Sequence, residues 1–313
     1  MIKIYKTIEK KLTKIGVEKI REKNSWIYIV SPTPEEIGTI TNTFDIPKDF
    51  IEDPLDINET PRIEREKNST LIIIQTPYYD DEEEHIKFIT IPLGIILAKE
   101  CLITVSSKDD DVLQNFFKGI VKNFSTNKRN RLILQILSKT ATVYLNYLKR
   151  INRQTTEIEN RLHKSMKNEE LINLLDFEKS LVYFSTSLRS NELVMERLYK
   201  TGILTKFEED EDFLEDLIIE NKQALEMTNI HSNILSSMMD AFASVISNNL
   251  NMVMKFLTSV TIILMIPTLI ASIYGMNIRL PFAKSPHAFA ITIGASIIFS
   301  LIGVFIFIKR KWF

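Results

Sequence analysis

The sequence predicts an α+β membrane protein, in which a cytoplasmic α/β domain and long helices precede two C-terminal transmembrane helices. Three observations carry this prediction. Short β-rich runs alternate with helical patterns in the first part of the chain, and two long stretches further on contain neither Gly nor Pro. Near the C-terminus, residues 256–273 and 288–308 carry no charge, and each stretch is about one bilayer thickness long when helical.

Residues 1–124 are expected to form the cytoplasmic α/β domain. Seven of the ten prolines and four of the eight glycines lie at or before Gly119, so this region is the most often interrupted. Helical patterns follow Pro34 and cover residues 111–124. Runs rich in β-branched and aromatic residues predict strands at residues 26–30, 71–75, 85–91 and 101–105.

Residues 125–251 are expected to form long cytoplasmic helices arranged as a funnel. Residues 120–201 contain neither Gly nor Pro, and two helices with a break near 163–168 fit this stretch. Residues 203–266 are also free of both, and at about 1.5 Å per residue one helix over most of them approaches about 100 Å. Such a length exceeds that of ordinary globular helices, so we expect a transmembrane helix that continues into the cytoplasm.

The two spans are assigned to residues 252–273 and 288–308, with a short external loop at 274–287. The basic tail at 309–313 follows the second span directly, and the positive-inside rule places it in the cytoplasm. The N-terminal sequence has no apolar run that could serve as the core of a signal peptide. We therefore expect a multi-pass protein of the plasma membrane with both termini in the cytoplasm.

Charge is distributed unevenly between these parts. No Asp or Glu follows Asp240, and residues 1–251 hold 33 basic and 40 acidic side chains, a formal charge of −7. The overall formal charge of −1 therefore conceals an acidic soluble portion joined to an apolar, mildly basic tail.

Small, polar or thioether side chains recur at helical spacing through the first span and the helix before it. Polar groups within a span usually face a bundle interior or water, which favours a pore lining. The alternative is that Ser and Thr only permit close helix packing. One chain with two spans cannot enclose a pore, so several copies would have to surround it. The stripe comprises Asp240, Ser244, Ser247, Asn251, Met254, Thr258, Thr261, Met265, Thr268 and Ser272.

The first span ends in Tyr274-Gly275-Met276-Asn277, and the chain ends in a Lys/Arg cluster followed by an aromatic residue. With Gly275, Met276 and Asn277 at this place, the sequence resembles the CorA family of magnesium channels over essentially its whole length. The resemblance implies a homopentamer that mediates passive, potential-driven Mg²⁺ influx, with Co²⁺ or Ni²⁺ as further cargo. It also implies that these three residues form the selectivity filter, where amide oxygens hold the hydrated ion.

The resemblance assigns further roles residue by residue. Asp240, Asn251, Met254 and Leu257 match pore-facing positions, and Met254 with Leu257 would form the hydrophobic constriction of the closed state. Asp53 and Asp216 match carboxylates that bind regulatory Mg²⁺ between neighbouring cytoplasmic domains. Without the resemblance, Asp53 reads as a loop or cap residue and Asp216 as part of a solvated acidic face.

Other functions find little support. The four histidines show no metal-ligand spacing, no catalytic set is apparent, and no Walker A loop is present, so we expect neither an enzyme nor an ATP-driven pump. Basic residues alternate with acids, which gives no nucleic-acid footprint. Two alternatives stay open: a zinc or cobalt transporter of the same architecture, and a membrane-anchored sensor of divalent cations.

Overall fold

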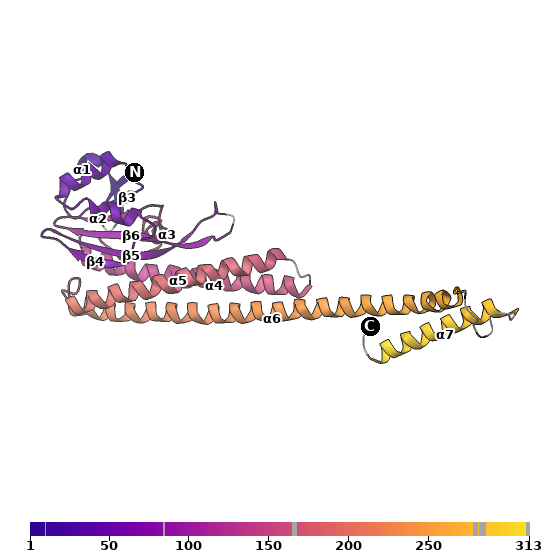
Figure 1. Ribbon diagram of the computed structural model, residues 1–313. Helices are drawn as coiled ribbons and strands as arrows, with labels where there is room; N and C mark the ends of the chain where they lie inside the picture. Colours follow the sequence, from indigo (N-terminus) through magenta and orange to yellow (C-terminus); the bar gives the residue numbers. More distant parts are fainter. Residues whose placement is uncertain (10, 84, 165–167, 278–280, 282–285, 311–313) are drawn as a thin grey trace. The chain divides into compact units, whose positions relative to one another are not determined.

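The computed structural model describes the chain except for residues 10, 84, 165–167, 278–280, 282–285 and 311–313. The chain divides into two compact units, Met1–Ser237 and Met238–Phe313, called here the first and second unit. Figure 1 shows the elements of both.

The first unit is built on one seven-stranded sheet of order β2-β1-β3-β7-β6-β5-β4. Only β3 and β7 pair in parallel among its neighbouring strands; all other pairs are antiparallel. The strands are β1 (Ile2–Ile8), β2 (Lys11–Ile15), β3 (Trp26–Val30), β4 (Arg62–Arg65), β5 (Ser69–Tyr79), β6 (Phe88–Ala98) and β7 (Leu102–Ser106).

Side chains alternate between the two faces of the sheet along each strand, and both faces are buried in hydrophobic clusters. In β3, Trp26 and Tyr28 enter one hydrophobic cluster, whereas Ile27 and Ile29 enter the other. Helices α1 (Pro34–Phe44) and α2 (Asp49–Glu52) cover the face of Ile27 and Ile29. The opposite face is covered by α3 (Asp111–Phe117), α4 (Arg129–Lys164), α5 (Asn168–Thr201) and the beginning of α6 (Glu208–Tyr274) (Figure 1).

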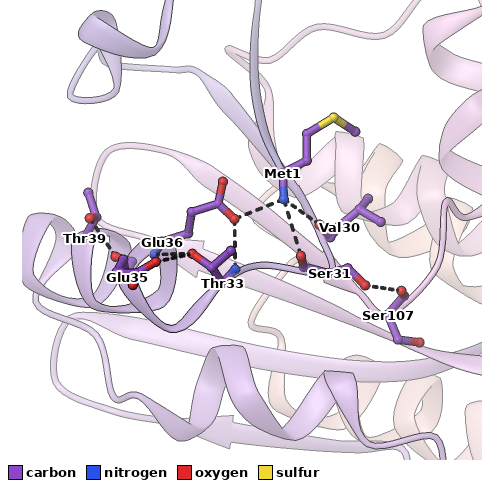
Figure 2. Close-up of polar contacts among 8 residues, drawn as sticks. All are labelled: Met1, Val30, Ser31, Thr33, Glu35, Glu36, Thr39 and Ser107. Atoms are coloured by element: carbon purple, nitrogen blue, oxygen red, sulfur yellow. Dashed lines mark hydrogen bonds and ion pairs between the residues drawn. The ribbon is translucent and has the colours of Figure 1, made fainter.

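Helix α1 begins with a capping box that also holds the start of the chain (Figure 2). The backbone N–H of Glu36 donates to the Thr33 hydroxyl, and the Glu36 carboxylate accepts from the N–H of Thr33 at 3.0 Å. The amino group of Met1 lies 3.0 Å from the same carboxylate and donates to the carbonyl of Val30 at 2.8 Å. The amino group of Met1 therefore joins the first turn of α1 to the end of β3.

Helix α5 is tied to the sheet by a buried amide. Strand β4 begins at Arg62, opposite Ile73, so Gln75 in β5 lies beyond the last residue that pairs with β4. The Asn191 carboxamide accepts from the N–H of Gln75 at 2.8 Å and donates to its carbonyl at 2.7 Å. The side chain thus replaces a missing strand partner.

The first part of helix α6 is in turn bonded to α5 and α4. The buried Asn221 carboxamide donates to the carbonyl of Leu188 in α5 at 2.9 Å. Arg131 of α4 forms an ion pair with Asp210 at 3.0 Å and lies over the ring of Phe213. Helices α4, α5 and the first part of α6 therefore pack as one layer.

The second unit contains the rest of α6 and α7 (Ala288–Lys309), both long and apolar enough to cross a membrane. With 67 residues, α6 is about 100 Å long at about 1.5 Å per residue. It passes through Pro267, which has no N–H to donate to the preceding turn. The predicted long helix is thus confirmed, although it begins at Glu208 and continues beyond the proline.

Several predicted elements are confirmed, and some of them have wrong bounds, among them the strand expected at 71–75, which is β5 and spans Ser69–Tyr79. The strand at 26–30 is β3, and the two helices of the first long stretch are α4 and α5. The predicted helix 111–124 ends at Phe117, because Gly119 turns the chain with a φ of 72°. The strand expected at 85–91 begins only at Phe88 and extends to Ala98.

Candidate functional site

The predicted stripe lies on an open side of α6. Each stripe residue, and Leu257 beside the stripe, is exposed in the chain. Met254, Leu257 and Met265 show 53%, 57% and 63% of their surface, which is unusual for large apolar side chains unless another solvent or another copy covers them. The exposed set is Asp240, Ser244, Ser247, Asn251, Met254, Leu257, Thr258, Thr261, Met265, Thr268 and Ser272.

The other side of α6 packs against α7. A Cβ at Gly303 would lie 3.4 Å from Cδ1 of Ile266 and 3.9 Å from Cγ1 of Ile263, so this glycine permits close approach. Ser259, one turn before Ile263, is fully buried. At 100° per residue, this side is more than a third of a turn away from the stripe. Helix α7 therefore leaves the stripe uncovered.

Along the stripe, the hydroxyls bond within the helix. Thr261 donates to the carbonyl of Leu257 at 2.8 Å, and Thr268 donates to that of Leu264 at 3.2 Å. Their lone pairs remain free to accept from water. The face can thus line a wet path without a fixed charge between Lys255 and the end of the helix.

The Gly-Met-Asn triplet continues the last turn of α6. The N–H of Gly275 donates to the carbonyl of Ala271 at 2.9 Å, and that of Met276 donates to Ile273 at 3.2 Å. A Cβ at position 275 would lie 3.3 Å from the Ala271 oxygen, so a larger residue would crowd this turn. Asn277 is exposed, and within the described residues no hydrogen bond occupies its carboxamide. The amide oxygen is therefore available to a ligand.

Asp53 is engaged within its own chain. Arg62 Nη2 lies 2.5 Å from Asp53 Oδ2, and the same guanidinium contacts Glu59 and Glu64. Burial raises the pKa of the Asp53 carboxyl, although Arg62 acts in the opposite direction. Pro54 beside it packs on β6 at Gly94. Arg62 escaped the sequence analysis because nine positions and a turn separate it from Asp53, and no local pattern signals the pair.

Asp216 and Asp53 belong to opposite layers of the first unit. Asp216 is exposed on α6, in the layer with α4 and α5, whereas Asp53 follows α2 on the other face of the sheet (Figure 1). No contact between the two carboxylates is found in the described part of the chain, and no group of three or more His, Cys, Asp or Glu able to hold a metal is found there either. A single chain does not bring the predicted pair together.

Parts of the expected external loop and basic tail lie outside the described residues, namely 278–280, 282–285 and 311–313. Of the basic cluster, Lys309 and Arg310 are described and Lys311 is not.

Comparisons with known proteins cover nearly the whole chain. The sequence profile of the family described as CorA-like Mg²⁺ transporter protein matches residues 21–310. The cobalt/magnesium transport protein CorA of Methanocaldococcus jannaschii is 29% identical over 315 residues, with 97% of this chain and 96% of that protein covered. The protein of the same description from Thermotoga maritima is 23% identical over 293 residues, with 92% and 83% covered. The complete structure of the M. jannaschii CorA magnesium transporter matches with a TM-score of 0.84 at 27% identity, covering 100% of this chain and 99% of that one.

Proposed function

The chain belongs to the CorA family of Mg²⁺ transporters, and on this basis we propose that it forms a homo-oligomeric channel for passive Mg²⁺ influx driven by the membrane potential. The observation that carries the proposal is the stripe of α6, which carries no charge after Asp240, is exposed opposite the α7 side and ends at the Gly-Met-Asn triplet. Copies arranged as a ring, a pentamer by resemblance to the family, would turn this stripe inward.

Asn277 would be the selectivity element. Mg²⁺ loses its water reluctantly, so a ring of amide oxygens that accept from the water shell binds the hydrated ion without dehydrating it. The exposed carboxamide at the end of α6 suits this role, and Gly275 and Met276 would set its position. The relatives described as cobalt/magnesium transport proteins support Co²⁺ as a second cargo.

Met254 and Leu257 would form the closed gate. Both are apolar and exposed on α6, next to polar positions of the stripe. A ring of such side chains excludes water from a narrow pore, and ions do not pass a dry constriction.

Cytoplasmic Mg²⁺ would hold the ring closed by binding between Asp53 of one copy and Asp216 of the next. The two carboxylates lie in opposite layers of one chain, so they can meet only across an interface between copies. The formal charge of −7 on residues 1–251 favours separation of the copies when no cation is bound. Helix α6 carries both Asp216 and the gate residues, which provides a covalent link between them. The ion biases closure only if it binds the closed ring more tightly.

We infer the orientation of the chain across the membrane from the basic residues beside the second span. Lys309 and Arg310 directly follow α7, so both termini would lie in the cytoplasm and the connection between α6 and α7 outside.

Flux through purified protein in liposomes tests the proposal. We expect wild-type protein to admit Mg²⁺ when the interior is made negative, as reported by an enclosed Mg²⁺-sensitive dye. Asn277→Ala removes an acceptor for charge-assisted hydrogen bonds of about 1.5–3 kcal/mol each, so uptake should fall at least about tenfold.

The matched control is Gln223→Ala, which removes an exposed carboxamide of α6 before the stripe begins. It should transport like the wild type. Absence of flux for every divalent cation would favour a membrane-anchored sensor, and undiminished flux in Asn277→Ala at equal abundance would remove Asn277 as the selectivity element.

A further inference from the structure

A polar cavity of about 280 Å³ opens in the first unit between the β5–β6 connection and helices α4 and α5. Its wall brings together residues that are far apart in the sequence: His85 from the connection, Gln154 and Glu157 from α4, and Asp176 from α5. None of them takes part in the proposed ion path or in the site at Asp53 and Asp216.

Asp176 is a buried carboxylate, and one of its oxygens accepts no hydrogen bond in the described part of the chain. Its exposed fraction is 6%, and its Oδ1 atom lies 3.6 Å from the ammonium group of Lys179. Its Oδ2 atom is buried and has no hydrogen-bond donor in the described part of the chain. A buried acceptor without a partner is costly, so this atom calls for a ligand that supplies positive charge or a donor.

The imidazole of His85 lies next to this oxygen. The Nδ1 atom of His85 lies 3.4 Å from Asp176 Oδ2, which makes an ion pair when the imidazole is protonated, and the two make no hydrogen bond. With metal–ligand bonds of about 2.0–2.2 Å and tetrahedral angles, two ligand atoms of one Zn²⁺ ion lie about 3.4 Å apart. Octahedral Mg²⁺ with bonds of about 2.1 Å would bring neighbouring ligands to about 3.0 Å. The pair therefore has the spacing of two ligands in a tetrahedral site.

The surroundings also favour a cation. Gln154 Oε1 is a second buried acceptor in this wall without a donor among the described residues. The basic side chains of the wall already have carboxylate neighbours: Arg161 lies 2.8 Å from Glu170, and Lys87 lies 3.9 Å from Asp81. The atoms that lack partners are thus all acceptors.

We propose that this cavity binds a divalent transition-metal ion of the Zn²⁺ or Co²⁺ class through His85 Nδ1 and Asp176 Oδ2. An imidazole nitrogen beside a carboxylate oxygen suits these borderline ions, whereas Mg²⁺ is bound mainly by oxygen. No third His, Cys, Asp or Glu completes a metal-binding group in the described residues, so water would fill the remaining positions, and the Gln154 oxygen in the same wall could accept from it. The ion would join the β5–β6 connection to α5.

The experiment uses the full-length protein in detergent with Co²⁺ as the probe. Excess Mg²⁺ is present to occupy sites built only from oxygen. Tetrahedral Co²⁺ with a nitrogen ligand gives intense visible d–d absorption, so the wild type should develop such bands with one such Co²⁺ per chain. His85→Ala and Asp176→Asn should each abolish the bands, and Zn²⁺ should displace the ion in the wild type.

His231→Ala is the matched control, because it removes a histidine of α6 outside the cavity and should leave the bands unchanged. Bands that persist in His85→Ala or in Asp176→Asn would overturn the proposed pair of ligands, as would an octahedral spectrum in the wild type. The readout is independent of Mg²⁺ flux, so the proposed transport function stands or falls separately.

Discussion

The two units of the chain use apolar residues in opposite ways. In the first unit, both faces of the sheet are packed, and Ile74, Leu93 and Ile95 are fully buried. In the second unit, no described residue of α7 is buried, and Leu301 and Phe305 expose 62% and 66% of their surface. Water drives the first unit to bury its side chains within one chain. Lipid tails are as apolar as Leu, so the second unit gains nothing comparable from folding on itself.

The difference shows where each unit finds its partners. The first unit pairs many of its polar groups within one chain, as when Asn191 bonds the backbone of Gln75. The second unit presents both its apolar surface and its polar stripe outward. Under the proposed function, lipid and other copies of the chain would cover these surfaces.

The largest expected effect concerns the proposed gate at Met254 and Leu257 in the second unit. Met254→Gly with Leu257→Gly removes both apolar side chains, and loss of a barrier of about 1.4 kcal/mol or more should raise the leak at high internal Mg²⁺ at least about tenfold. Single-channel or liposome leak currents measure it. Met252→Gly with Val253→Gly has the same backbone cost away from the stripe and should stay closed. A double mutant at 254 and 257 as tightly shut as wild type would place the gate elsewhere.

The contrast in burial is tested by equal truncations in the two units. Ile74→Ala should lower the free energy of unfolding of the first unit by about 2–5 kcal/mol, because it leaves a cavity in a packed core. Leu301→Ala on α7 should change it by less than about 0.5 kcal/mol. Fluorescence of the buried Trp26 in a Trp312→Phe background follows this unit alone. Equal losses would show that the two units unfold together.

Acidity should affect the first unit through Asp110, the N-cap of α3. Burial raises the pKa of its carboxyl to about 6. The unfolded chain ionises it near its ordinary value, so stability should fall as the pH rises from about 4 to 6, by up to about 3 kcal/mol. Asp110→Asn keeps the cap and should remove this slope, which Trp26-monitored unfolding at several pH values measures. Asp212→Asn, exposed on α6, should retain it, and an unchanged slope in Asp110→Asn would contradict the assignment.

The smallest expected effect concerns Arg62, which occupies Asp53 in the single chain. A partly exposed ion pair contributes up to about 1 kcal/mol, so Arg62→Gln should lower the Mg²⁺ concentration for half-maximal protease protection by up to about fivefold.

The double mutant Asp53→Ala with Asp216→Ala serves as the reference, because it should abolish the Mg²⁺ dependence of both protection and current. If that double mutant titrates like wild type, the two residues are not the sensor.

The sequence analysis identified the elements with strong local patterns. The continuous apolar run of β3 and the uncharged spans are patterns of neighbouring residues, which the sequence shows directly. It missed β1, β2 and β4, because β1 and β2 are interrupted by lysines and β4 has only four residues. These strands gain their order from neighbours in the sheet, which no local pattern records.

The site was predictable to the extent that it lies on one helix. Helical spacing alone groups the stripe of α6, and the triplet marks its end. The ion pair of Asp53 with Arg62 and the approach of His85 to Asp176 depend on the tertiary fold. Two strands and two helices lie between His85 and Asp176, so a search for local metal-ligand spacing among the histidines did not reveal this pair.

The close contact between Gly94 and Pro54 restricts which substitutions this protein can accept during evolution. A Cβ built at position 94 would lie 2.3 Å from Cγ and 2.9 Å from Cβ of Pro54, the residue that follows Asp53. Every amino acid other than glycine carries that atom, so each missense mutation of this codon displaces the turn that holds the carboxylate. We therefore expect substitutions at position 94 to be accompanied by substitutions at position 54 among related sequences.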